Sequence, residues 1–199
     1  MERPDFVHLH LHSEYSLSDG IIRISELVSR ASSLQYSAVG LTDLTNLFGL
    51  LEFYRSSREK GIKPIVGAEV NVIKDKDSLP APIVLLVKDK KGYKNLTEIV
   101  SKAYIDGQVN GEPTVELSLL KDLSVGLIAL SGGMEGHVGQ SILAGNIPLA
   151  ESRIKFFQQI FGEDFFIEVH RLGKTNEEEY NNAAIEIATR MNVPVVATN

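Results

Sequence analysis

The chain has 199 residues, no cysteine and a formal net charge of −6 at pH 7. Its length allows one domain, residues 1–199, with a hydrophobic core of its own, and the lack of cysteine excludes disulfides, thiolate nucleophiles and cysteine-rich zinc sites. The acidic balance disfavours non-specific binding to nucleic acid, which depends on lysine and arginine contacts to phosphates.

Seven short apolar runs, rich in β-branched residues, predict strands. Most of these runs are continuous instead of alternating, which is typical of strands buried on both faces of a parallel sheet. In chain order they span residues 6–9, 38–42, 63–72, 83–87, 126–130, 165–169 and 193–197.

Helical patterns lie between most of these strands. Gly61 and Gly162 end two of them, and Asn176 precedes three glutamates that suit the positive end of another helix. Residues 106–113 are rich in turn formers, which indicates a surface loop. The predicted helices span residues 25–34, 47–60, 93–104, 147–161 and 176–191.

The β/α alternation fits either an open doubly wound sheet or a closed barrel. No Gly-x-Gly-x-x-Gly motif follows the first predicted strand, and polar side chains follow several different strands, as at the rim of a barrel. We therefore predict an α/β fold, a distorted (β/α)7 barrel similar to that of triosephosphate isomerase.

Three of the five histidines, His8, His10 and His12, alternate along the first predicted strand. Alternate side chains of a strand share one face, so we expect their imidazoles to converge. Two such imidazoles can hold one metal ion if a carboxylate completes the site. If the strand ends meet at one rim, the candidates that join the histidines there are Asp19, Asp43, Glu69 and His170.

Six blocks of the sequence, in order, closely resemble the N-terminal PHP (polymerase and histidinol phosphatase) domain of bacterial DNA polymerase III alpha subunits. They are HLHLHSEYSLSDG, LTDLTNLFGLLEFY, GIKPIVGAEVNV, KGYKNLTEIVSKAY, GLIALSGG and PVVATN. The resemblance covers essentially the whole chain. It implies metal ligands at His10 and His12, a further ligand-like position at Asp19 and a bridging acid at Glu69.

The resemblance also implies that three ligand positions are lost at the rim. Leu44 replaces the histidine of the family's Thr-Asp-His motif, Pro82 replaces a histidine near the fourth strand, and Gly133 replaces a cysteine or histidine after the fifth. Without these donors a trinuclear cluster cannot assemble, and catalysis is not expected. We expect no cofactor, or one weakly bound divalent metal ion (zinc, manganese or magnesium) at a vestigial site.

Two kinds of function follow from this resemblance. The first is a scaffold in DNA replication that docks the proofreading exonuclease subunit and contacts the remaining polymerase domains, with DNA bound only through the holoenzyme. The second is an active phosphoesterase, pyrophosphatase or 3′–5′ exonuclease built on the four surviving positions.

A third interpretation, less favoured than these two, is a stand-alone enzyme of the histidinol-phosphatase kind. The end of the chain at Asn199, directly after a predicted strand, disfavours it and indicates a piece of a longer polymerase.

The surviving positions also have structural interpretations. His10 and His12 would serve equally well as hydrogen-bonded packing residues of the barrel. Asp19 precedes a glycine and would suit the cap of a helix that begins near Ile21. Both interpretations stand beside the metal-ligand one.

The other polar candidates are given structural roles. Asp43 would support the loop that follows it through Asn46, and His8 is expected outside the ligand shell or on the surface. His137 and His170 match no family role and are expected to be ordinary side chains. No basic leader precedes a long apolar run, and none of the apolar runs reaches the ~18 residues of a membrane span, so we expect a cytoplasmic location and no membrane partner.

Overall fold

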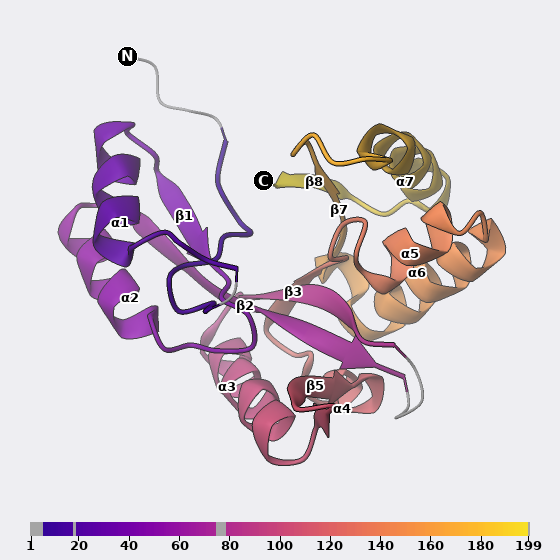
Figure 1. The fold of residues 1–199 in the computed structure, drawn as a ribbon, viewed down its shortest axis with the longest axis horizontal. Coiled ribbons are helices and arrows are strands. Elements are labelled where there is room, and N and C mark those ends of the chain that lie inside the picture. Colours follow the sequence, from indigo (N-terminus) through magenta and orange to yellow (C-terminus); the bar gives the residue numbers. More distant parts are fainter. Residues whose placement is uncertain (1–5, 18, 75–78, 199) are drawn as a thin grey trace.

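The computed structural model describes residues 6–17, 19–74 and 79–198. They form a curved eight-stranded sheet with the helices on its outer side (Figure 1). The strands are β1 Ala38–Leu41, β2 Lys63–Ile73, β3 Ala81–Val87, β4 Gln108–Val109, β5 Glu112–Glu116, β6 Leu127–Leu130, β7 Phe165–His170 and β8 Val195–Thr198. The α/β class predicted from the sequence is confirmed.

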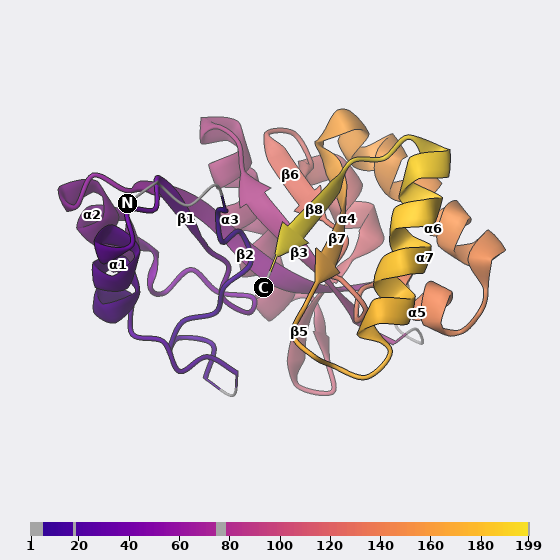
Figure 2. The same ribbon diagram turned by 90° about the horizontal axis from the view of Figure 1, so that it is seen from above.

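Seven α-helices are present in the described residues, and α1 and α2 lie at one end of the molecule with α5, α6 and α7 at the other (Figure 2). They are α1 Ile24–Ser33, α2 Leu50–Glu59, α3 Lys90–Ile105, α4 Leu117–Leu123, α5 His137–Leu143, α6 Ile147–Phe161 and α7 Glu177–Met191, with a 3-10 turn at Gly162–Asp164. All five predicted helices exist within a few residues of their predicted bounds.

The order of strands in the sheet is β4-β5-β2-β3-β6-β7-β8, and β1 pairs with the first half of β2 on the edge that β5 occupies further along. The prediction of a parallel sheet fails at β3, which is antiparallel to both β2 and β6, and the short β4 is antiparallel to β5. Only residues 74–80 separate β2 from β3. A link of this length cannot hold the crossover helix that a parallel return needs.

The first predicted strand, residues 6–9, is not a ladder strand in the structure. It is an extended segment that runs beside β1, where the Gly40 amide donates to the His8 carbonyl at 2.6 Å and the Thr42 amide donates to the Leu11 carbonyl at 2.9 Å. Among the described residues, no ladder joins this segment or β1 to β8. The two ends of the sheet therefore meet through side chains instead of backbone pairing.

A small apolar cluster fills the inside of the curved sheet. Val84, Leu86 and Leu130 are its buried centre, and Leu9 from the first segment and Val196 from β8 pack against it from the two ends of the chain. Side chains on the inner face alternate along each strand. On β2 and β7 the same inner face therefore continues from apolar residues to Glu69 and Glu168.

The outer face of the sheet carries the main core. Ala68, Val70, Ile83, Leu85 and Ile167 are buried there against residues of α3 to α7, and a separate cluster packs α1 and α2 onto β1. The continuous apolar runs of the sequence are explained by this arrangement, because β2, β3, β6 and β7 are covered on both faces.

Four short elements, α4, α5, β4 and β5, were not predicted. Helices α4 and α5 have seven residues each, which is too short to display a helical period clearly. Residues 106–113, predicted as a surface loop, contain β4 and the start of β5. Asn110 and Gly111 both have positive φ, as a tight two-residue hairpin turn requires.

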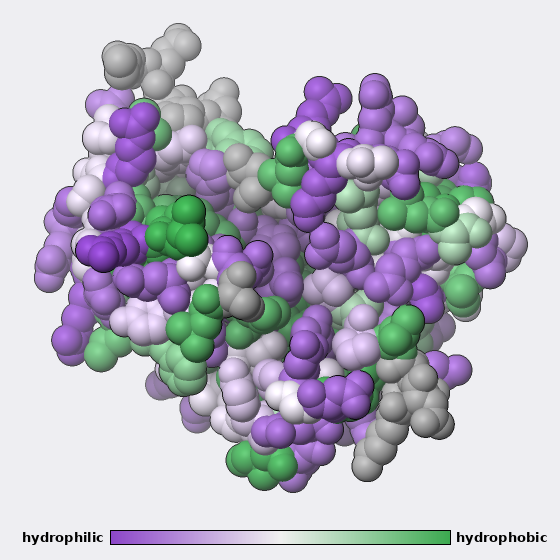
Figure 3. All heavy atoms as spheres, in the orientation of Figure 1, coloured by the Kyte–Doolittle hydropathy of each residue, from purple (hydrophilic) through white to green (hydrophobic). Residues whose placement is uncertain are grey.

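Polar residues cover most of the face drawn in Figure 3, and the apolar residues on it lie in small separate groups. Within the described part of the chain, none of the helices has the length and apolar character to cross a bilayer.

Candidate metal site

A cavity of about 590 Å³ opens at the polar end of the curved sheet. Residues distant in sequence meet in it, because the first segment, the middle of β2, the loop after β6 and the end of β7 all contribute to its lining. The lining includes His8, His10, His12, Asp19, Glu69, Pro82, Gly132 and His170.

His10 lies between two carboxylates. Its Nε2 is 2.6 Å from Oε2 of Glu69, and its Nδ1 is 2.8 Å from Oε1 of Glu168. An ionised carboxylate only accepts hydrogen bonds, so both ring nitrogens donate and the ring is an imidazolium in the arrangement shown. His10 thus joins β2 to β7 across the inside of the sheet.

The His12 ring, like the His10 ring, directs its Nε2 toward Glu69. Its Nδ1 is 2.5 Å from Oδ2 of Asp19, and its Nε2 is 3.6 Å from Oε2 of Glu69. This Nε2 is buried and has no hydrogen-bond partner within the described residues. A buried nitrogen of this kind is costly unless something binds it.

The charges of the cluster shift the pKa values of its members. Burial, the largest single influence, lowers the pKa of His10, but Glu168 and Glu69 together outweigh it and raise that pKa to about 10. Burial likewise opposes ionisation of Glu69, yet the hydrogen bond from His10 and the nearby His12 imidazole lower its pKa to about 2. The pKa of Glu168 is lowered by His10 and His170 in spite of its burial. Both carboxylates are therefore ionised at neutral pH.

Glu69 is held by the backbone around it. Its amide lies 3.2 Å from the carbonyls of Thr42 and Asp43, and its carbonyl accepts from the Thr45 amide at 2.7 Å. The loop after β1 therefore fixes β2 at this point, and the Glu69 side chain projects into the cavity.

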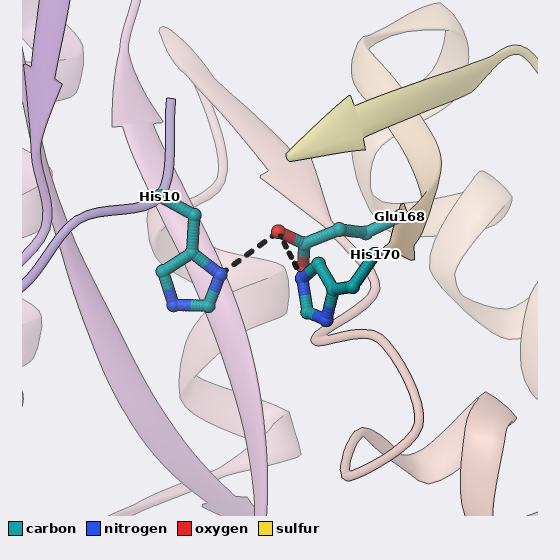
Figure 4. Close-up of side chains that lie close together, drawn as sticks. All are labelled: His10, Glu168 and His170. Atoms are coloured by element: carbon teal, nitrogen blue, oxygen red, sulfur yellow. Dashed lines mark hydrogen bonds and ion pairs between the residues drawn. The ribbon is translucent and has the colours of Figure 1, made fainter. Parts of the chain in front are cut away.

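Glu168 of β7 was missed as a member of the site, and His170, a rim candidate that was expected to be an ordinary side chain, lies beside it (Figure 4). Glu168 is fully buried, and its Oε1 also accepts from the Thr198 hydroxyl at 2.6 Å and lies 3.2 Å from Nε2 of His170. Its Oε2 accepts from the Gly132 amide at 3.1 Å. The sequence did contain a signal. A glutamate inside the apolar run Phe165–His170 is unusual, because buried carboxylates occur almost only with partners.

Asp43 lies below the rim and not in the cavity. It is buried and accepts from the Ser13 amide at 2.6 Å, the Ser13 hydroxyl at 2.8 Å and the Ser16 hydroxyl at 2.7 Å. It thus secures the loop that precedes α1. The prediction that Asp43 supports its own following loop through Asn46 is wrong, because Asn46 instead binds the carbonyls of Tyr15 and Leu44.

The other two histidines, His8 and His137, have different partners. His8 contacts Tyr36, with its Nε2 3.3 Å from the hydroxyl, so only His10 and His12 of the alternating three converge. His137 is buried at the start of α5 and hydrogen-bonds the Val72 carbonyl at 3.1 Å. Burial and the nearby Arg153 charge lower its pKa.

The family model for the PHP domain matches residues 8–172 of the chain. The chain belongs to the PHP family. Over its whole length it is 43% identical to DNA polymerase III subunit alpha of Escherichia coli K12 and 40% identical to that of Vibrio cholerae, and it spans 17% of each of these relatives. Across 98% of the chain it is 40% identical to the Pseudomonas aeruginosa subunit, of which it also spans 17%. The matched part of these relatives is their N-terminal region.

Two solved structures share the fold of this PHP domain. An amidohydrolase from Chromobacterium violaceum, solved with sulfate and no metal, has a TM-score of 0.66 at 17% identity, covering 97% of this chain and 86% of its own. A Bifidobacterium adolescentis protein assigned as a metal-dependent phosphoesterase has a TM-score of 0.58 at 16% identity, covering 99% of this chain and 88% of its own. The PHP domain therefore shares a barrel-like α/β architecture with these two proteins.

Three rim positions of this PHP domain carry no donor side chain. Leu44 forms a backbone bridge with Glu69, and Pro82 lines the cavity. At Gly133, with φ +59°, an added Cβ would lie 2.5 Å from Cε1 of His170. The imidazole from β7 thus occupies the space next to Gly133, and any larger residue there must displace it.

The donors that the PHP domain does carry fit one divalent ion. His10, His12 and Glu69 place one ligand atom each within 4.8 Å of one another, and His10, Glu168 and His170 do the same. Asp19 belongs to neither group, because its carboxylate lies on the outer nitrogen of His12. The orphaned Nε2 of His12 makes the first group the better fit, since a metal there would satisfy it.

Proposed function

We propose that this PHP domain is the N-terminal part of a DNA polymerase III alpha subunit and acts in replication as a scaffold, with at most one divalent ion at its rim and no catalysis of its own. The whole-length identity of 40–43% to such subunits supports the assignment. The relatives are about six times longer, so nucleotidyl transfer is assigned to residues outside these 199. We place the protein in the bacterial cytoplasm with its replication machinery.

One observation carries the single-ion proposal: both donor groups of the described residues use His10. A neutral imidazole has one lone pair to donate, so the two groups cannot be filled together. Two-metal hydrolysis needs ions about 3.5–4 Å apart that stabilise the attacking and leaving oxygens. A rim with a shared histidine does not supply that pair.

The donor set also ranks the candidate ions. Two imidazoles and one carboxylate suit zinc and manganese, and magnesium prefers oxygen ligands and retained waters. When bound, such an ion would polarise an oxygen ligand and could stabilise the rim in place of the His10 proton. Asp19, Asp43, Leu44 and Gly133 would not be ligands.

Calorimetric titration of the metal-free chain with Zn²⁺ and Mn²⁺ tests the proposal. We expect one ion per chain and more than about 100-fold weaker binding in His10→Ala, since second-sphere changes alone cost 10–100-fold. His137→Gln removes an imidazole outside the cavity and should leave the affinity unchanged. We also expect no metal-stimulated hydrolysis of a model phosphodiester.

The contrary result would be two or three ions per chain together with hydrolysis that is lost in His10→Ala and His12→Ala. That result would support the alternative, an active phosphoesterase, pyrophosphatase or 3′–5′ exonuclease. The buried, unpartnered Nε2 of His12 is the observation in its favour, because it shows a donor still directed toward Glu69.

Docking of the proofreading exonuclease subunit is the proposed scaffold role, and it rests on the relationship to polymerase III alpha subunits. Titration of the purified exonuclease subunit with the chain should give a 1:1 complex with a dissociation constant below about 10 μM. Docking and metal binding are separable, so His10→Ala should dock normally. Failure to associate at about 50 μM would count against docking through this domain.

A further inference from the structure

The cavity contains a repeated arrangement of carboxylate and histidine. Glu168 contacts Nδ1 of His10 at 2.8 Å, and Asp19 contacts Nδ1 of His12 at 2.5 Å. In both cases Nε2 is the nitrogen that faces Oε2 of Glu69, at 2.6 Å and 3.6 Å. Each imidazole thus contacts a carboxylate of its own through Nδ1, and both rings direct Nε2 toward the same oxygen of Glu69.

We propose that Glu168 and Asp19 are positioning residues that keep the proton on Nδ1 of His10 and of His12, so that the Nε2 atoms of both rings are the metal donors. The proposal rests on the single-ion site proposed above. A ligating histidine commonly donates its other N–H to a carboxylate, which fixes ring orientation and raises ligand basicity.

Glu168 is suited to this role because all its other hydrogen bonds fix it in place. Its Oε1 also accepts from Thr198 and contacts His170 as an ion pair, and its Oε2 accepts from the Gly132 amide. The Glu168 amide is bonded to the Ser131 hydroxyl at 3.0 Å, and its carbonyl accepts from the Tyr180 hydroxyl at 2.6 Å. The carboxylate therefore cannot turn away from His10 without leaving several buried donors unpaired.

Asp19 has the same contact in a different setting. Its side chain is 62% exposed, and its one described polar partner is His12. An exposed carboxylate is screened by water and free to rotate, so it orients an imidazole less firmly than a buried one. The two residues are thus expected to contribute unequally.

The same contacts make Glu168 an unfavourable metal ligand. Four donors already surround its two oxygens, so metal binding at Glu168 would require the loss of contacts that hold β7 to the loop after β6 and to β8. Glu69 has only the two histidines as side-chain partners in the described residues, and its oxygens are available once a metal replaces the His10 proton.

The test uses the ¹⁵N-labelled 199-residue chain. In the metal-free protein, long-range ring correlations should show a proton on Nδ1 of His10 and of His12. With ¹¹³Cd²⁺ added, scalar coupling should appear to Nε2 of both rings. A proton confined to Nε2 without metal, or coupling of cadmium to Nδ1 of either ring, would overturn the proposal.

Variants separate positioning from stability. In Glu168→Gln either orientation of the amide sets a donor against a donor, at His10 or at the Gly132 amide, and zinc affinity should fall about 100-fold. Asp19→Ala changes an exposed side chain. It should lower zinc affinity about 10-fold and change the Nδ1 proton signal of His12. Thr198→Val removes one of the bonds that fix Glu168 but none to His10, and should lower zinc affinity less than Glu168→Gln does.

The outcomes distinguish this inference from the single-ion proposal. If the wild-type chain binds no metal, the proposed metal site is wrong, and the metal-free spectra of wild type and Asp19→Ala still decide whether the carboxylates set the proton position. If metal binds at one site and neither Asp19→Ala nor Glu168→Gln changes affinity or ring signals, the positioning role is wrong and the site remains.

Discussion

Replacing Glu168 with leucine is expected to lower the free energy of unfolding of the metal-free chain by about 3–5 kcal/mol, the usual cost of removing one partner of a buried charged pair. The loss follows from the contacts of this side chain, which is fully buried and accepts from His10, His170, Thr198 and the Gly132 amide. Leucine has similar volume and no acceptor, so all four donors lose a partner at once. Urea denaturation followed by circular dichroism measures the change.

Thr198→Val is the matched control for this experiment. It removes one hydrogen bond to the same carboxylate at a site that is 3% exposed, and should cost only about 1 kcal/mol. If Glu168→Leu lies within that same range, the carboxylate is not the centre of the network that joins the first segment, β6, β7 and β8.

Gly133→Ala should be the second most damaging change, with a loss of about 2–4 kcal/mol. Two costs combine at this position. The backbone has φ +59°, a conformation that residues with a Cβ rarely adopt, and the new Cβ would lie 2.5 Å from Cε1 of His170. Movement of His170 would also weaken its contact with Glu168.

Two further variants isolate the steric part of this effect. Gly61 has φ +71° and nothing within 4 Å of an added Cβ, so Gly61→Ala should show the backbone cost alone, about 1 kcal/mol. The double variant Gly133→Ala with His170→Ala should lose about 1–3 kcal/mol less than the two single losses added together. Strict additivity would mean that His170 does not occupy the space beside Gly133.

Much of the fold was predicted from local patterns. The apolar runs that became β2, β3, β6 and β7 are covered on both faces, and the stop signals at Gly61 and Gly162 follow α2 and α6. The antiparallel direction of β3 was not predicted. The sequence did contain the information, because the link between β2 and β3, residues 74–80, is too short for a crossover helix. Helices α4 and α5 were missed because seven residues give too little periodicity.

The side chains that could form the rim were predicted from local sequence patterns. They are the alternating His10 and His12, Glu69 in a long apolar run, and Leu44, Pro82 and Gly133, which carry no donor atom. Their pairing could not be predicted in this way, because it depends on how the chain folds in three dimensions. In the folded chain Glu168 contacts His10, which is 158 positions away in the sequence. Asp19 contacts Nδ1 of His12, and His170 lies beside Gly133. Local patterns record periodicity and chain reversal, whereas these contacts depend on the curvature of the sheet that brings β2, β7 and the first segment together.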